Sequence, residues 1–328
     1  MDQVLSGTAL DAPIHDFLAH QRTLGRGYEN VERVLRGLRD FLVLIGTGDL
    51  DQTAFDRWCH HLAPLSANTR RSRQLVVHKF CLYRRRTDSS CFVPDPLYFA
   101  RPQPYRAPVI VEPEQVARML ACAAALPPST NSPLRAQVLR LAIVLLYTAG
   151  LRRGEVLRLT LADVDDEAGV VRVRESKFHK SRLVPLSASA HGELRRYLRA
   201  RLAVCSDIRP VAPLLCNYSR GWRPYTGTGL RDAISRLFDQ TGVRDAQDRR
   251  PRVHDLRHSF AVQALTRLYR RGEDVQSRLP HLSLYMGHVS IVSTAYYLHF
   301  VPTLAALASE RFARQCGHLI QELSDEQP

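Results

Sequence analysis

Six prolines fall within residues 94–113, PDPLYFARPQPYRAPVIVEP, and they constrain the fold more than any other feature. Proline lacks a backbone N–H and biases the residue before it toward extended geometry, so a helix cannot continue through this stretch. A chain of 328 residues is also long enough for two domains. We therefore predict a first domain over residues 1–101, a proline-rich linker over residues 102–112 and a second domain over residues 113–328.

The segment before the prolines has a helical pattern. In YENVERVLRGLRDFLVLIG, residues 28–46, apolar side chains recur at spacings of three and four, which places them on one face of a helix. A further helix is expected to begin at Ser66, in LSANTRRSRQLVVHKFCLYRRR, because serine is a good N-cap. The first domain is therefore predicted to be a small helical bundle.

Both kinds of secondary structure are expected after the linker. Residues 170–174, VVRVR, alternate valine with arginine as a strand does, and residues 182–186, RLVPL, form a second short strand. The expected helices cover residues 134–148, 192–202, 228–241, 254–270 and 303–322. The predicted fold class is mainly α with a small β-sheet, that is, α+β.

The charge of the chain favours a polyanionic partner. Basic residues outnumber acidic ones by 46 to 32, which gives a net charge of +14 and a pI of about 9.9. Nucleic acid is the first candidate and an anionic membrane the second. Only three of the basic residues are lysines, as codon bias in a GC-rich genome would produce. That bias explains arginine over lysine, but it does not explain the excess of base over acid.

The sequence contains no membrane signal. No stretch approaches the ~20 apolar residues of a membrane span, and the start, MDQVLSGTALDAP, lacks the basic and apolar regions of a secretory signal. The seven cysteines stand singly, without a C-x-x-C pair, which favours a reducing compartment over a disulfide framework. We expect a cytoplasmic protein with no membrane partner.

The helix expected after Ser66 carries many positive charges within a few turns. A basic helical face is often only solvated, but cations this dense repel one another unless a phosphate backbone lies alongside. The residues predicted to bind DNA are Arg70, Arg71, Arg73, Lys79 and Arg84.

Four stretches contain residues that could do chemistry. YTAGLRRGEVLRL places Arg152 where a turn leads into a helix, and ESKFHKSR places Lys177 at a hairpin tip. VHDLRHSFA places His254 and Arg257 three residues apart, on one helix face. MGHVSIVSTAYY contains His288 and two adjacent tyrosines.

Each of these stretches, taken singly, also has an ordinary structural interpretation. Arginines and hairpin lysines are usually solvated, and tyrosines near a helix are mostly half-buried. His254 and His258 are four apart and could bind zinc, but the segment lacks the glutamate of H-E-x-x-H and no third ligand is evident. We therefore predict no metal site.

The combination and order of these residues resemble the tyrosine recombinases, the phage-integrase and Xer-like family. AGLRRGEVLRL, HDLRHSFA and MGHVSIVSTAYY are similar to three boxes of that family, with Met286 in place of the usual leucine. The resemblance covers residues 107–300, and more loosely the basic helical region, which looks like the family's core-binding domain. It implies a second, catalytic domain, no cofactor, and the catalytic residues Arg152, Lys177, His254, Arg257, His288 and Tyr297.

The resemblance also chooses between the two tyrosines. In the family the nucleophile follows the Gly-His histidine by nine residues, which from His288 leads to Tyr297. Neighbouring helical positions differ by about 100°, so only one of the pair can enter a given pocket. Tyr297 is therefore expected to react and Tyr296 to pack.

The chemistry implied needs these residue types. A tyrosine phenol can store phosphodiester energy in a 3′-phosphotyrosine link while a sugar 5′-hydroxyl leaves. Arg152 and Arg257 would offer planar forks of donors to the phosphate oxygens. His254 is expected to accept the tyrosine proton and His288 to hydrogen-bond the phosphate.

A lysine suits the protonation of the leaving hydroxyl, because arginine is a poor acid. Two of the three lysines fall within SKFHK, and the resemblance favours Lys177 over Lys180. Glu155 is predicted to be a buried acid that orients the pocket.

The resemblance further implies a partner and an assembly. The partner is double-stranded DNA with a specific core site, held by two domains that form a clamp. The amphipathic stretch TLAALASERFARQCGHLIQEL either packs on its own domain or docks on a neighbour in a tetramer on two paired sites. Of the physiological roles, we expect integration, excision or transposition of a mobile element. The alternatives are a type IB topoisomerase-like relaxing enzyme and a non-catalytic DNA-binding regulator.

Overall fold

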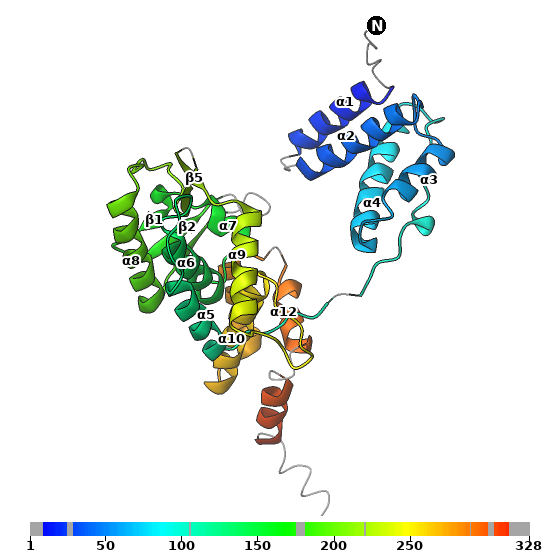
Figure 1. The fold of residues 1–328 in the computed structure, drawn as a ribbon. Coiled ribbons are helices and arrows are strands. Elements are labelled where there is room, and N and C mark those ends of the chain that lie inside the picture. The colour runs from blue at the N-terminus through cyan, green and yellow to red at the C-terminus, as the bar shows by residue number, and fades with distance from the viewer. Residues whose placement is uncertain are drawn as a thin grey trace, which may run out of the picture. The chain divides into compact units, whose positions relative to one another are not determined.

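The computed structural model describes residues 9–24, 29–104, 106–174, 181–219, 221–288, 290–300 and 305–314. The chain divides into two compact units, Met1–Arg106 and Ala107–Pro328 (Figure 1). The boundary lies within the proline-rich stretch 94–113, where the described residues before Pro113, the start of a helix, contain only one short 3-10 turn, at Pro96–Tyr98. Because the prolines lack backbone N–H donors, a helix longer than this turn does not form there.

The described part of the first unit is helical. Its elements are α1 (Asp11–Thr23), α2 (Glu29–Leu44), α3 (Gln52–His61), α4 (Ala67–Arg84) and the 3-10 turn η1 (Pro96–Tyr98). The helix expected within residues 28–46 is α2, which buries Leu35 and Leu38 in one core with Phe80 of α4. Ser66 caps α4 as predicted, because its Oγ accepts the Thr69 N–H at 3.3 Å.

The second unit contains helices and two small sheets. Its helices are α5 (Pro113–Ala124), α6 (Arg135–Thr148), α7 (Arg153–Arg158), η2 (Leu161–Asp163), α8 (Ala188–Val204), α9 (Gly227–Gln240), α10 (Asp255–Arg270), α11 (Val275–Met286) and α12 (Val292–Phe300). Residues 141–146 of α6 are all buried, so this part of the helix is apolar on every side and lies in the core.

Three strands form an antiparallel sheet in the order β1-β2-β3, comprising Val164–Asp165, Val170–Val173 and Arg182–Pro185. Val171 pairs with Val184, and both are buried, while Arg172, the next residue of β2, is exposed. A separate hairpin pairs β4 (Cys216–Tyr218) with β5 (Trp222–Pro224). The expected strands at 170–174 and 182–186 are thus β2 and β3, and the predicted α+β fold class is confirmed.

A helix also covers residues 305–314 near the C-terminus. It lies inside the expected helix over residues 303–322, whose remaining positions fall outside the described residues. Its Arg311 donates to the backbone carbonyls of Glu273 at 2.7 Å and Gly272 at 3.1 Å. Among the described helices, none combines the length and apolar character that crossing a membrane requires.

Candidate active site

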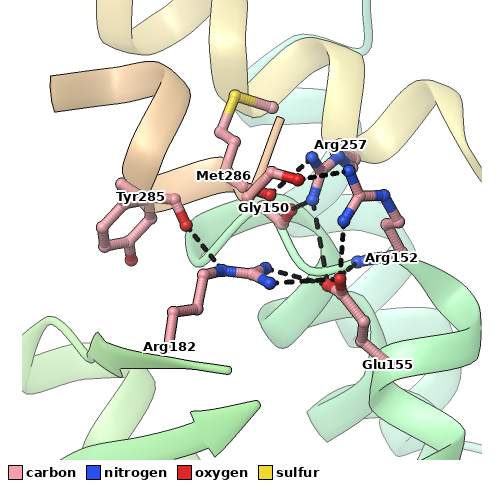
Figure 2. A network of polar contacts seen from close by, with 8 residues as sticks. Gly150, Arg152, Glu155, Arg182, Arg257, Tyr285 and Met286 are labelled. Atoms are coloured by element: carbon pink, nitrogen blue, oxygen red, sulfur yellow. Dashed lines mark hydrogen bonds and ion pairs between the residues drawn. The ribbon is translucent and has the colours of Figure 1, made fainter. Parts of the chain in front are cut away.

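Four segments of the second unit meet around one carboxylate, that of Glu155 (Figure 2). They are the start of α7, the start of β3, the first turns of α10, and the junction between α11 and α12. Their contacts join residues more than one hundred positions apart, as with Arg152 and Gly287. The site is therefore a product of tertiary folding.

A tight turn places Arg152 beside Glu155. Gly150 has φ +61°, a left-handed conformation that favours glycine, and a Cβ added there would lie 2.4 Å from the Phe260 ring. Arg152 then occupies the N-cap of α7. The Glu155 carboxylate accepts the Arg152 backbone N–H at 2.9 Å and its guanidinium at 2.7 Å. The turn and the first helical turn thus hold one arginine against one acid.

Arg257 lies deeper, on α10, with 1% of its side chain exposed. It donates to the carbonyls of Gly150 and Met286, the latter at 2.7 Å, and its Nη1 lies 3.9 Å from Glu155. Burial and then the charge of Arg152 lower the pKa of Arg257 to about 9, while Glu155 and Tyr297 act in the opposite direction. Arg257 therefore keeps its charge at neutral pH, and the phenol of Tyr297 lies within its electrostatic reach.

Arg182 completes the cluster, and the sequence analysis did not identify it. Its guanidinium donates to both oxygens of Glu155, at 3.1 and 2.9 Å, and to the Tyr285 carbonyl at 2.8 Å. Figure 2 shows the side chain reaching from β3 across to Glu155. A single arginine in an arginine-rich chain carries no local signal, so only the folded structure could reveal it.

The cluster as a whole is cationic. Burial alone would raise the pKa of Glu155, but hydrogen bonds from Arg182 and Arg152 lower it to about 2, so the carboxylate is ionised. Three guanidiniums around one carboxylate leave two positive charges in excess. Arg152 is the most accessible arginine, with 24% of its side chain exposed against 10% for Arg182. This arrangement can stabilise an anion that gains charge during reaction, as a phosphodiester does.

The two tyrosines differ in their surroundings. Tyr297 is 2% exposed, and its hydroxyl lies 2.6 Å from Nδ1 of His258. Tyr296 is half-buried and packs edge-on against the Tyr297 ring. Burial and then His254 lower the pKa of His258 to about 4, so its imidazole is neutral at pH 7 and can accept the phenol proton.

His258 is a second residue that sequence reasoning missed as a participant. It follows Arg257 directly, and the sequence analysis considered it only as a partner of His254 in a zinc pair. The two imidazoles lie edge to face with centroids 4.7 Å apart. Within the part of the chain that the structure describes, no group of three or more His, Cys, Asp or Glu residues could hold a metal.

The other two predicted histidines lie at the edges of the site. His254 is exposed, at the N-cap of α10. His288 directly follows Gly287, and its Nδ1 lies 2.7 Å from the Thr294 hydroxyl. Burial, with Arg257 and Arg152, lowers the pKa of His288 to about 3. The imidazole is therefore neutral and presents one N–H and one lone pair.

The remaining predicted residues are Lys177 and the basic residues of the first unit. Lys177 falls among residues 175–180, outside the described residues. Within the first unit, Arg84 binds both oxygens of Asp49, at 2.7 and 2.6 Å, and Arg71 donates to the Ala100 carbonyl at 3.3 Å. The pair with Asp49 makes Arg84 less available to a phosphate than the exposed Lys79.

Comparison with known proteins places the chain in a family. Residues 110–302 match the model of the phage integrase family. A putative integrase/recombinase of Sinorhizobium fredii (strain NBRC 101917 / NGR234), y4rB, is 34% identical over 308 residues, 92% of this chain and 96% of that protein. The tyrosine recombinase XerD of Ralstonia nicotianae (strain ATCC BAA-1114 / GMI1000) is 32% identical over 235 residues, 71% of this chain and 69% of that protein.

The fold has a counterpart among solved structures. The Tn1549 transposon integrase, solved in complex with circular intermediate DNA, matches with a TM-score of 0.61 at 20% identity. The match covers 91% of this chain and 99% of that one. At this identity the likeness concerns the fold alone.

Together the fold and the relatives define a site-specific recombinase, an enzyme that breaks and rejoins DNA strands. The chain belongs to the phage integrase family, within the tyrosine recombinases. The resemblance seen in its sequence motifs is thereby confirmed.

Proposed function

We propose that this recombinase cuts and rejoins DNA through a 3′-phosphotyrosine intermediate in which Tyr297 is the nucleophile. The observation that carries the proposal is the hydroxyl of Tyr297, 2.6 Å from a neutral imidazole and within electrostatic reach of the buried Arg257. A phenol with an adjacent proton acceptor and a cationic anion site has what nucleophilic attack on a phosphodiester requires.

The reaction balances without a cofactor. The Tyr297 oxygen bonds to phosphorus, the bond from phosphorus to the 5′ oxygen breaks, and the phenol proton passes to a histidine. Lys177 gives a proton to the leaving 5′ oxygen, while Arg152 and Arg257 hold the non-bridging oxygens. Attack by the 5′-hydroxyl of a partner strand reverses these steps and frees the tyrosine. One phosphodiester replaces another, so no external energy source is needed.

A nicked suicide duplex tests the proposal. Cleavage releases a short 5′-ended fragment that diffuses away, so the covalent protein–DNA adduct accumulates and is seen on a denaturing gel. A regulator that only binds DNA forms no adduct. A type IB topoisomerase-like enzyme forms the adduct and relaxes supercoils, but it does not exchange strands between two paired sites.

The geometry favours His258 over His254 as the acceptor of the phenol proton, because Nδ1 of His258 lies within hydrogen-bond distance of the Tyr297 hydroxyl, at 2.6 Å. We expect His258→Leu to slow adduct formation by about 10²-fold or more, a typical contribution of a general base. The exposed His254 would instead contact the incoming phosphate. Single-turnover rates of His258→Leu and His254→Leu, with DNA affinity measured for each, separate the roles. A normal rate of adduct formation in His258→Leu, together with a slow rate in His254→Leu, would identify His254 as the acceptor of the phenol proton.

For the assembly, we propose that four copies bind two specific sites on double-stranded DNA, with basic side chains of the first unit on the phosphate backbone. Support comes from the C-terminal helix over residues 305–314. Phe312 on it is 60% exposed, although Arg311 attaches the helix to its own unit. Phe312 is the side chain that we propose a neighbouring copy covers.

Deletion of residues 303–328 is expected to abolish cooperative binding to paired sites while leaving adduct formation on a single site within about threefold. A gel-shift titration on DNA with one site and with two sites measures this. Phe312→Ser is the matched variant that keeps the Arg311 contacts. Intact cooperativity in the deletion would assign the helix to its own domain only.

For the physiological role, we propose integration, excision or transposition of a mobile element. It is supported by the curated relative y4rB, a putative integrase/recombinase whose length the match nearly spans, and by the fold of a transposon integrase. Such a reaction would take place on DNA in the cytoplasm.

A further inference from the structure

His288 lies between α11 and α12, and hydrogen bonds fix both its main chain and its ring. Its backbone N–H donates to the Ser283 carbonyl at 2.9 Å, which closes the last turn of α11 beside the left-handed Gly287. Its ring nitrogen Nδ1 lies 2.7 Å from the hydroxyl of Thr294, in the first turn of α12. The main chain of His288 is therefore attached to one helix and its side chain to the next.

Thr294 makes this contact from a site shielded from water. Its side chain is fully buried, and its backbone N–H donates to the Ile291 carbonyl at 2.8 Å. Thr294 and Tyr297 are three positions apart on α12 and both are buried, whereas Ser293 is exposed. They therefore share the inward face of the helix. The hydrogen bond ties His288 to the helix face that carries the tyrosine.

The two carbonyls just before His288 accept the two arginines that we propose hold the phosphate. The Met286 carbonyl accepts Arg257 at 2.7 Å (Figure 2), and the Gly287 carbonyl accepts Arg152 at 2.7 Å. Burial, followed by the charges of both arginines, lowers the pKa of the imidazole, so the ring is neutral. A neutral ring bonded through Nδ1 has Nε2 left to meet a substrate.

The direction of the bond to Nδ1 decides which ring nitrogen carries the proton. A threonine hydroxyl can donate to Nδ1 or accept from it. A phosphate oxygen is an acceptor, so an imidazole that helps to bind it must carry its proton on Nε2. We infer that Thr294 is a positioning residue, whose hydroxyl donates to Nδ1 of His288 and holds the ring with Nε2–H directed at the phosphate. This role rests on the proposed function.

Single-turnover cleavage of the suicide duplex tests the role. Thr294→Val keeps the shape of the side chain and removes the hydroxyl, and we expect it to slow adduct formation at saturating DNA by about 10–100-fold, as the loss of partners that orient metal-binding histidines does. Thr294→Ser keeps the hydroxyl and should stay within about threefold of the wild-type rate. Thr241→Val is the matched control, because that hydroxyl donates to the Leu237 carbonyl at the end of α9, outside the four segments of the site.

Two further measurements separate positioning from a general disturbance of α12. If Thr294 acts through His288, then Thr294→Val should slow His288→Phe by less than about twofold, because the contact is already lost. The ¹⁵N chemical shifts of the His288 ring, assigned from their loss in His288→Phe, report the tautomer. We expect the proton on Nε2 in the wild type and in Thr294→Ser, and a mixture of both tautomers in Thr294→Val.

The outcomes separate the two proposals. A wild-type rate in Thr294→Val, an additive loss in the double variant, or a wild-type imidazole with its proton on Nδ1 overturns the positioning role. If Thr294→Val does not fold, Thr294→Ala takes its place, and the tautomer of the wild-type protein still decides. A wild-type protein that forms no adduct would overturn the proposed function itself, and the positioning role with it.

Discussion

Tyr297→Phe is expected to form no covalent adduct with a suicide duplex, whereas Tyr296→Phe forms it at a rate close to wild type. Phenylalanine lacks the hydroxyl that we propose takes over the phosphate, so a loss of at least about four orders of magnitude is expected. The packing of the ring survives in phenylalanine. The substitution removes the hydrogen bond between the hydroxyl and His258.

The paired variants control for stability and for DNA binding. Tyr296 and Tyr297 are adjacent and their rings touch, so a general disturbance of α12 would appear in both variants. Gel shifts on an intact duplex should give wild-type affinity for each. An adduct in Tyr297→Phe, mapped by peptide sequencing to any other residue, would refute the assignment of the nucleophile.

Arg257→Met should be the second most damaging change. The side chain resembles arginine in length but offers no donors, so the phosphate loses its deepest cationic contact. The loss of one such donor costs roughly 3–4 kcal/mol of transition-state stabilisation, or about 10²–10³-fold in rate. Arg257→Lys keeps a charge but lacks the planar fork, and we expect it to recover only part of the rate.

Stability must be measured alongside, because Arg257 also satisfies the carbonyls of Gly150 and Met286. Leaving buried acceptors unpaired costs about 1–3 kcal/mol each. Thermal melting therefore accompanies single-turnover cleavage at saturating DNA. Arg231, 54% exposed and paired with its neighbour Asp232 on the surface, is the matched control for the loss of one arginine. A folded Arg257→Met that cleaves at the wild-type rate would remove Arg257 from the catalytic set.

Much of the fold followed from local patterns. The helices α2 and α6 and the strands β2 and β3 appear where apolar periodicity and alternation predicted them, and α4 begins after its predicted N-cap, Ser66. These patterns report which face of an element is buried, and burial is the main force that places each element. They do not report which elements meet, so the sheet order and the central position of α6 required the structure.

For the candidate site too, the sequence predicted some of the residues and only the structure revealed the others. Motif spacing pointed to Arg152, Arg257 and Tyr297, and the structure places them in one neighbourhood of the second unit. Motif spacing did not point to Arg182 or to the contact between His258 and Tyr297. The contacts that distinguish them from other arginines and histidines come from distant residues, with 103 positions between Arg182 and Tyr285. Lys177 lies outside the described residues and remains a prediction.

The sequence by itself determined the chemical inventory: a phenol, two arginines with planar forks, histidines and a scarce lysine, in an order that identifies the family. Tertiary structure alone decided that Arg152, Arg182 and Arg257 share one carboxylate and three neighbouring carbonyls. The reason is physical, because a guanidinium acquires a role only from the acceptors that folding brings within about 3 Å of its donors.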